Sequence, residues 1–122
     1  MNPKTTKIIQ WALTILVALI FIPSGIMKIM QTPEVIEGAT KFGLDPKAFL
    51  YIGIVEIIAV ILFINPRTGV LGTLLLAAYL GGAIATHVLS KDSIMAPCVI
   101  QAFIWMVAVY RFPELRMRLF GK

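Results

Sequence analysis

The chain has 122 residues and a net charge of +5, and 59% of its residues are hydrophobic whereas only 14% are charged. A water-soluble domain of this size does not need so large an apolar share, so the composition excludes that class and favours a membrane protein. The length leaves room for a single domain, residues 1–122, and for no second one.

Four apolar stretches are long enough to cross a bilayer, which takes about 20 residues of helix. We predict spans over residues 8–29, 47–64, 67–89 and 94–111. The expected fold class is therefore all-α, an integral membrane four-helix bundle.

The first span carries Ser24 and Lys28 near its end. These residues are four apart, so they lie on the same face of the helix. Lys28 has two open interpretations. Its ammonium either extends to the lipid headgroups, or it pairs with an acid inside the bundle.

Residues 31–44 are too polar to span a membrane, but they carry the signals of a short helix. Thr32 can cap the helix, Pro33 suits its first position, and Gly43 can end it. Apolar residues recur at helical spacing: Val35, Ile36, Ala39 and Phe42. We predict a short interfacial helix between the first and second spans.

The second span contains Glu56, the only acid inside any apolar stretch. A charge near the centre of a bilayer costs several kcal/mol unless a partner or water reaches it. We predict that Glu56 meets Lys28 and His87, the only histidine. The alternative is that Glu56 is protonated and serves as a hydrogen-bonding group that holds helices together.

The third span is rich in small residues. Gly81 and Gly82 belong to two patterns in which small residues recur every fourth position, which permits close helix packing within the chain or between copies. His87, near the end of this span, has a second interpretation as an interfacial histidine bonded to a backbone carbonyl.

Counting the helical rise places polar residues of all four spans at similar depth, between the middle and the outer end. They are Ser24, Lys28, Glu56, Tyr79, Thr86, His87 and Gln101. We predict that they form a polar pocket in the outer half of the membrane. One histidine and one acid are too few ligands for a closed metal site, so no metal is predicted.

The Lys and Arg residues predict the orientation. With both termini cytoplasmic, seven basic residues lie inside and four outside, in agreement with the positive-inside rule. We therefore expect a multi-pass protein of the plasma or inner membrane. The expected partners are the lipid bilayer and, beyond it, another membrane protein or further copies of the chain. The basic residues are assigned to topology and lipid contacts, and nucleic acid is not expected.

Several short motifs resemble the DoxX-like family of small four-span membrane proteins. They are the run FIPSGIMK ending at Lys28, FGLDP from Phe42, GIVE ending at Glu56, and GAIATH ending at His87. The resemblance implies the four-span fold. The broader family includes a quinone-linked thiosulfate-oxidising membrane subunit and an animal membrane chaperone of acetylcholine receptors. For thiol redox chemistry this chain departs from such relatives, because it has only Cys98.

These observations favour a non-enzymatic protein, either an assembly or chaperone-like partner or a binder of a small lipophilic ligand. No cofactor is predicted, although the resemblance admits a quinone. Two alternatives remain open, and with them the question of whether the protein is an enzyme. One is a quinone-linked oxidoreductase membrane subunit in which Lys28, Glu56 and His87 handle protons. The other is a small proton-coupled transporter in which Glu56 titrates.

Overall fold

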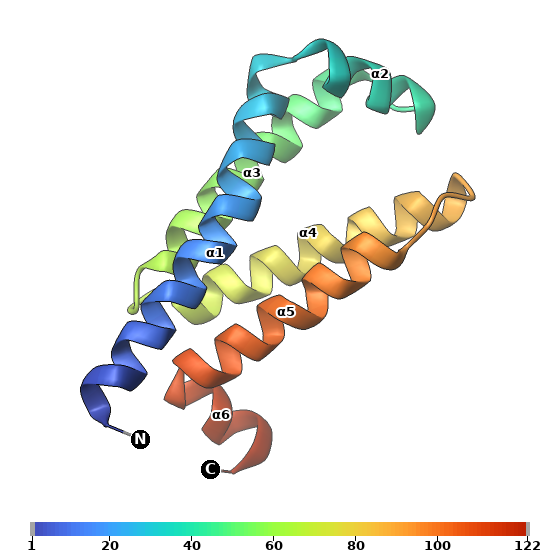
Figure 1. Cartoon of the computed structure of the whole chain (residues 1–122). Helices are drawn as coiled ribbons and strands as arrows, with labels where there is room; N and C mark the ends of the chain where they lie inside the picture. The colour runs from blue at the N-terminus through green and yellow to red at the C-terminus, as the bar shows by residue number, and fades with distance from the viewer. Residues whose placement is uncertain (1, 122) are drawn as a thin grey trace.

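The computed structural model describes residues 2–121, which fold into six α-helices (Figure 1). Their bounds are α1 Pro3–Met30, α2 Pro33–Lys41, α3 Pro46–Ile64, α4 Gly69–Leu89, α5 Met95–Arg111 and α6 Pro113–Phe120. The described part contains no strand. The predicted all-α class is confirmed.

The helix starts follow from local sequence. Four of the six helices begin with proline, where a missing N–H breaks no helical hydrogen bond. The Thr32 side chain accepts a hydrogen bond from the Val35 N–H at the start of α2, and Asp45 accepts one from the Lys47 N–H at the start of α3. The short helix predicted between the first two spans is α2.

Within residues 2–121, three helices are long and apolar enough to cross a membrane, namely α1, α3 and α4. Helix α5 qualifies only together with α6, and the two are bent by 104° at Phe112 and Pro113. The chain is therefore a multi-pass membrane protein with three spans, or four if α5 and α6 count as one. The four predicted spans correspond to α1, α3, α4 and α5.

The helices form two pairs that diverge. Helix α1 lies along α3, and α4 lies along α5 (Figure 1). The pairs meet near the short link between α3 and α4, at the end of the molecule where both termini lie, and separate toward the end where α2 lies. We call these the terminal end and the α2 end.

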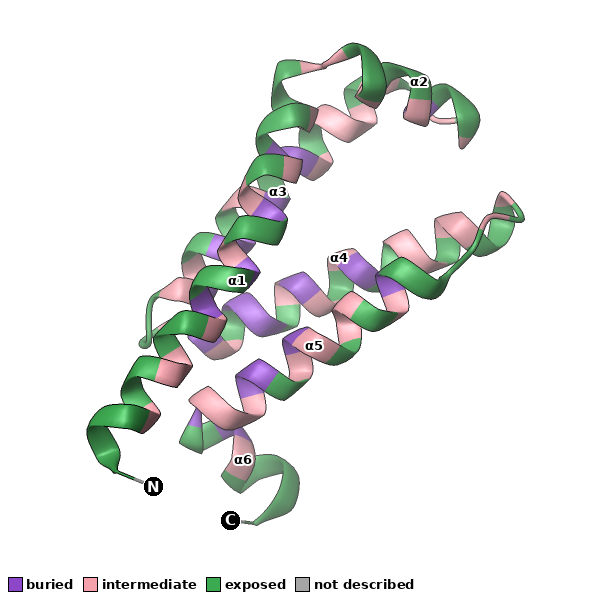
Figure 2. Cartoon of the chain, viewed as in Figure 1, coloured by how far each residue is buried: buried purple, intermediate pink, exposed green. Residues whose placement is uncertain are grey.

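Buried residues gather where the two pairs converge, as Figure 2 shows. The core contains large apolar side chains from four helices: Val17, Phe21, Phe63, Leu76, Ile104 and Val107. The outward faces expose large apolar side chains such as Leu19, Ile58 and Met106, which suits a lipid surrounding.

Glycines set the closest helix approaches. A Cβ added at Gly53 would lie 2.8 Å from the Gly25 carbonyl oxygen, so α1 and α3 are nearly in backbone contact there. A Cβ at Gly72 would lie 2.3 Å from the backbone nitrogen of Phe63. Gly81 and Gly82 differ, because a Cβ at either would meet no other described atom within 4 Å. Close packing within the chain therefore uses Gly72 and not the pair at 81 and 82.

Candidate functional site

The polar centre of the molecule is the Lys28 ammonium, which binds groups from three helices. Its Nζ donates to Ser24 Oγ at 2.6 Å, to Glu56 Oε1 at 3.0 Å and to Tyr79 OH at 3.1 Å. An ammonium has three N–H donors, so these acceptors use all of them. The predicted contact between Lys28 and Glu56 is thus present as an ion pair.

Local sequence explains why these groups meet. Ser24 lies one turn before Lys28 on α1, and Gly53 lies one turn before Glu56 on α3. A Cβ at Gly53 would lie 2.8 Å from Lys28 Cβ, so the missing side chain lets α1 bring Lys28 beside the carboxylate. Tyr79 then approaches from α4.

The ion pair is almost entirely shielded. Glu56 is 1% exposed and the Lys28 side chain 14%. The second carboxylate oxygen, Glu56 Oε2, is buried and has no hydrogen-bond partner among the described residues. The pairing removes most of the penalty for two charges inside an apolar bundle, and one acceptor remains for a proton or a water molecule.

A cavity of about 570 Å³ opens beside this centre, between α3 and α4 and beneath the segment that ends α2. Its walls are mainly apolar, with Phe42, Phe49, Ile52, Val55, Leu75 and Ala83 among them. Four of the predicted polar residues reach it: Lys28, Tyr79, Thr86 and His87. Ser24 and Glu56 are not among the residues that line it, and they contact Lys28 instead.

The expectation that His87 meets Glu56 is wrong. Tyr79 is the α4 residue at the level of Glu56, and His87 lies eight residues further, about 12 Å along the helix. His87 Nδ1 is instead 2.7 Å from the Ala83 carbonyl oxygen, as its interfacial interpretation expected. Because a carbonyl only accepts, Nδ1 carries a proton, and Nε2 can accept a hydrogen bond when it carries none.

Thr86 and Gln101 also bond to backbone. The Thr86 hydroxyl donates to the Gly82 carbonyl at 2.8 Å. Gln101 does not line the cavity, contrary to the expectation. Its Nε2 donates to the Ala77 carbonyl at 3.1 Å, and its Oε1 is buried without a partner among the described residues. The reason is that α5 packs against α4 (Figure 1), whereas the cavity lies between α3 and α4.

Sequence reasoning did not identify the contacts that hold α2 over the cavity. The Phe42 and His87 rings lie 5.0 Å apart between centroids, and Lys41 Nζ lies 3.2 Å from Asp92 Oδ2. The hydrogen bond from Lys41 holds the pKa of Asp92 below its ordinary value. Phe42 belonged to the apolar pattern of the short helix, which was the only sequence signal for this contact.

The arrangement contains no obvious metal centre: among residues 2–121, no three His, Cys, Asp or Glu side chains lie close enough to share an ion. What it offers is a charged pair with one unpartnered carboxylate oxygen, and a phenol and an imidazole beside an apolar space.

The family comparison matches residues 12–109 to the DoxX-like family. The chain belongs to the DoxX-like family. The match begins in α1 and ends in α5, so it includes every residue of the Lys28 centre and of the cavity wall. No curated protein and no solved structure matches the chain. The family membership therefore supports the membrane fold of this DoxX-like protein and leaves its activity to be argued from the site.

Proposed function

We propose that this DoxX-like protein binds a small lipophilic molecule with a polar head in the cavity between α3 and α4. The observation that carries the proposal is a cavity of about 570 Å³ whose walls are mostly apolar and whose few polar groups converge from separate helices. Ligand sites in proteins typically combine this size with such a lining.

The Lys28 centre prepares Tyr79 to contact the ligand. Lys28 has no free donor, since Ser24, Glu56 and Tyr79 accept all three of its hydrogen bonds. The Tyr79 hydroxyl accepts from Lys28 and keeps its own proton to donate. A hydroxyl that accepts from a cation becomes a stronger donor, so Tyr79 is suited to bind a carbonyl or hydroxyl oxygen.

His87 supplies a second contact further along α4. Because Nδ1 donates to the Ala83 carbonyl, Nε2 is the ring nitrogen that can accept a hydrogen bond from a ligand. The ligand class that fits has an oxygen acceptor for Tyr79, a donor such as a hydroxyl within reach of His87, and an apolar body.

A quinol belongs to this class, and the corresponding quinone has the apolar body and the oxygen acceptor for Tyr79 but no donor for His87. A ring oxygen of either form suits Tyr79, and a hydrocarbon tail suits the apolar wall formed by residues such as Ile52 and Val55. When bound, such a group would supply redox chemistry, and this is the link to the oxidoreductase alternative. The residues of the chain itself bind, orient and shield it.

A second candidate function, assembly with another membrane protein, depends on a different observation. Gly81 and Gly82 leave open space on α4, and small residues on an open helix face permit close approach by another helix. Substitutions at these neighbouring glycines can distinguish the two functions, because Gly82 lines the cavity and Gly81 does not.

The experiment compares Gly82→Leu with Gly81→Leu in the purified full chain. The probe is a benzoquinone with a decyl tail, and its affinity is measured by titration in detergent. Gly82→Leu fills the cavity and should weaken binding about tenfold or more, whereas Gly81→Leu should leave it unchanged. Unchanged binding by Gly82→Leu would contradict the cavity proposal. Loss of a co-purifying membrane protein with Gly81→Leu would support the assembly role instead.

A further inference from the structure

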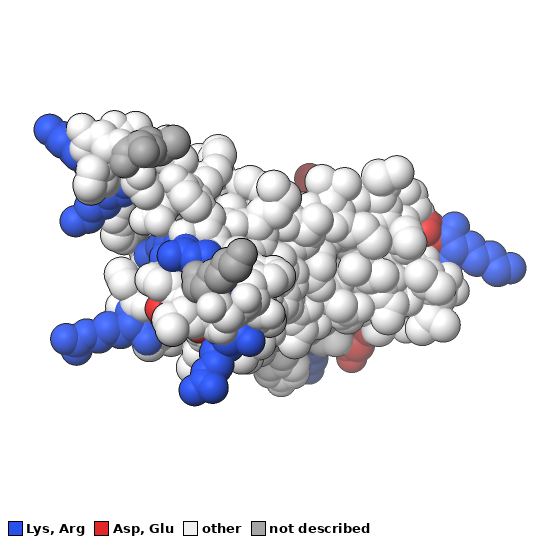
Figure 3. Space-filling model, turned by 90° about the horizontal axis from the view of Figure 1, so that it is seen from below, with Lys and Arg blue, Asp and Glu red and all other residues white. Residues whose placement is uncertain are grey.

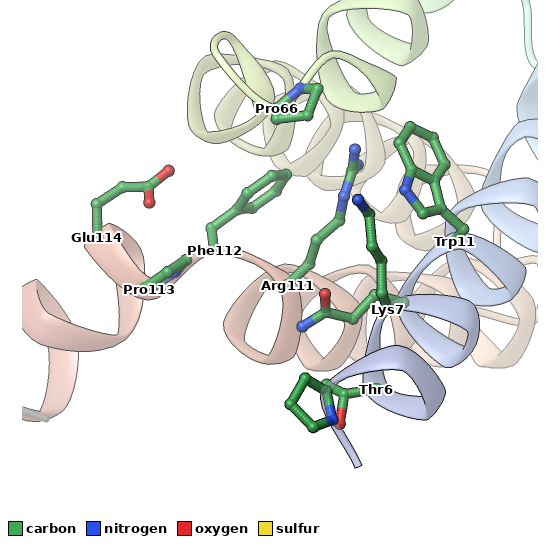
Figure 4. A pocket seen from close by; sticks show the side chains of 10 residues that line it. Thr6, Lys7, Trp11, Pro66, Arg111, Phe112, Pro113 and Glu114 are labelled. Carbon is green, nitrogen blue, oxygen red and sulfur yellow. The ribbon is translucent and has the colours of Figure 1, made fainter.

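A second pocket, of about 590 Å³, lies at the terminal end (Figure 4), and it shares no lining residue with the cavity beside Tyr79. It is enclosed by the first turns of α1, the link between α3 and α4, and the bend between α5 and α6. Its lining includes Lys7, Trp11, Pro66, Arg111 and Phe112.

Arg111 is fixed in this pocket by the end of α3. Its guanidinium donates to the carbonyl oxygens of Phe63, at 2.5 Å, and of Ile64. These are the last carbonyls of α3, the negative end of a helix. The guanidinium carbon also lies 5.0 Å from the Trp11 ring centre and 4.9 Å from that of Phe112. The two hydrogen bonds leave three of the five N–H groups of Arg111 for another acceptor.

Lys7 adds a second cation to the same pocket. In Figure 4 its side chain extends beside Arg111 and Trp11. Lys7 Nζ has no hydrogen-bond or ion-pair partner in residues 2–121, and the side chain is exposed. The one acid of the pocket, Glu114, is separated from both cations in this view by the Phe112 ring. Two cations therefore face the same space with no carboxylate between them.

The position of the pocket relative to the membrane follows from the length of α1. A helix of 28 residues is about 42 Å long, whereas the hydrocarbon core is about 30 Å thick. The excess places the first turns of α1 in the headgroup layer. Trp11 suits that boundary, where tryptophans concentrate. Figure 3, a view from below, shows many Lys and Arg side chains around this end.

We propose that this pocket binds the phosphate of an anionic phospholipid. The Lys7 ammonium and the free N–H groups of Arg111 contact the phosphate oxygens, and the rings of Trp11 and Phe112 pack against the glycerol and the first acyl carbons. The site is separate from the cavity beside Tyr79, so it stands or fails independently of the lipophilic ligand proposed above.

The test uses native mass spectrometry of the purified full chain with phosphatidylglycerol or phosphatidylcholine of identical acyl chains. Phosphatidylglycerol should be retained more strongly. Lys7→Gln should lower that retention about fivefold, as expected for one basic residue close to an anionic lipid. Lys4→Gln is the matched control, because it removes the same charge one turn away and outside the pocket. Glu114→Gln should not weaken retention.

Three results would overturn the proposal. Equal retention of the two lipids would remove the requirement for an anionic headgroup. Equal losses in Lys7→Gln and Lys4→Gln would show diffuse attraction without a site. Displacement of the lipid by an excess of inorganic phosphate would assign the pocket to a free anion.

Discussion

At the scale of single residues, the ion pair between Lys28 and Glu56 holds together the helices that form the site. The acceptors of Lys28 come from α1, α3 and α4, so one side chain ties together both members of one helix pair and a helix of the other. Removing one member of a buried pair leaves the other charge without compensation, which typically destabilises a protein by about 3–5 kcal/mol.

Glu56→Gln tests this support. The amide keeps the shape and one acceptor but removes the charge, so we expect a loss of about 3 kcal/mol, the lower end of that range. Thermal unfolding in detergent measures it. Adding Lys28→Met should recover part of the loss, and Glu37→Gln, an exposed acid on α2, is the control. A silent Glu56→Gln with no recovery in the double variant would mean that Glu56 is protonated and structural.

Tyr79→Phe tests the proposed contact between the Tyr79 hydroxyl and the ligand. The change removes the hydroxyl that is proposed to contact the ligand, and this hydroxyl is also one of the three acceptors of Lys28. The affinity for the decyl benzoquinone should therefore fall about tenfold. Tyr51→Phe is the control, because Tyr51 lines the same cavity and is 65% exposed. Equal effects of the two changes would remove the special role of Tyr79.

At the scale of elements, two side-chain contacts hold the end of α2 over the cavity. The ring contact of Phe42 with His87 and the ion pair of Lys41 with Asp92 join the segment after α1 to α4 and its following loop. Since the pKa of Asp92 is lowered in the folded protein, this contribution is present above about pH 4 and is lost as the pH falls through the lowered pKa.

Amide hydrogen exchange in a nanodisc measures this closure. We expect protection across residues 36–42 at neutral pH and faster exchange there in Asp92→Asn. In the unchanged protein, the exchange rate of this segment should rise by a similar factor when the pH falls below 4, after correction for intrinsic exchange rates. Lys47→Gln, which removes an exposed charge outside the contact, should have no effect. Rapid exchange throughout the segment at neutral pH would instead indicate a disordered loop.

Local sequence was sufficient to predict these elements, because caps and prolines act within one or two turns. Thr32 and Pro33 located the start of α2. The rotation and divergence of the helices depend on packing between distant residues. For this reason counting depth along α4 placed His87 near Glu56, and counting along α5 placed Gln101 in the pocket, although neither contact forms.

The pairing of Lys28 with Glu56 could be predicted for a physical reason that does not depend on geometry. A lone carboxylate inside an apolar stretch requires a partner, and the chain offers few. A polar pocket was predicted, but its mainly apolar walls were not, since they result from the divergence of two helix pairs and from the small side chains of Ala78, Gly82 and Ala83.

At the scale of the whole molecule, the distribution of Lys and Arg predicts the membrane orientation. We expect both termini on the cytoplasmic side, which would place the pocket of Lys7 and Arg111 in the inner leaflet, where anionic lipids are abundant. Single cysteines at Asn2 and Leu119, in a Cys98→Ala background, should resist an impermeant thiol reagent added to intact cells. A cysteine at Glu37 should react. Labelling at either end from outside would reverse or break this topology.

The most direct test of the central proposal is to locate the bound molecule by photo-cross-linking. A decyl benzoquinone with a diazirine in its tail is bound to the full chain and activated, and the modified peptides are mapped by mass spectrometry. We predict modification of cavity residues within 49–55 and 75–87, reduced by an excess of the unmodified probe and by Gly82→Leu. Modification confined to lipid-facing residues such as Leu19 and Met106, unaffected by competitor, would show that the probe remains in the surrounding lipid or detergent and would contradict the account.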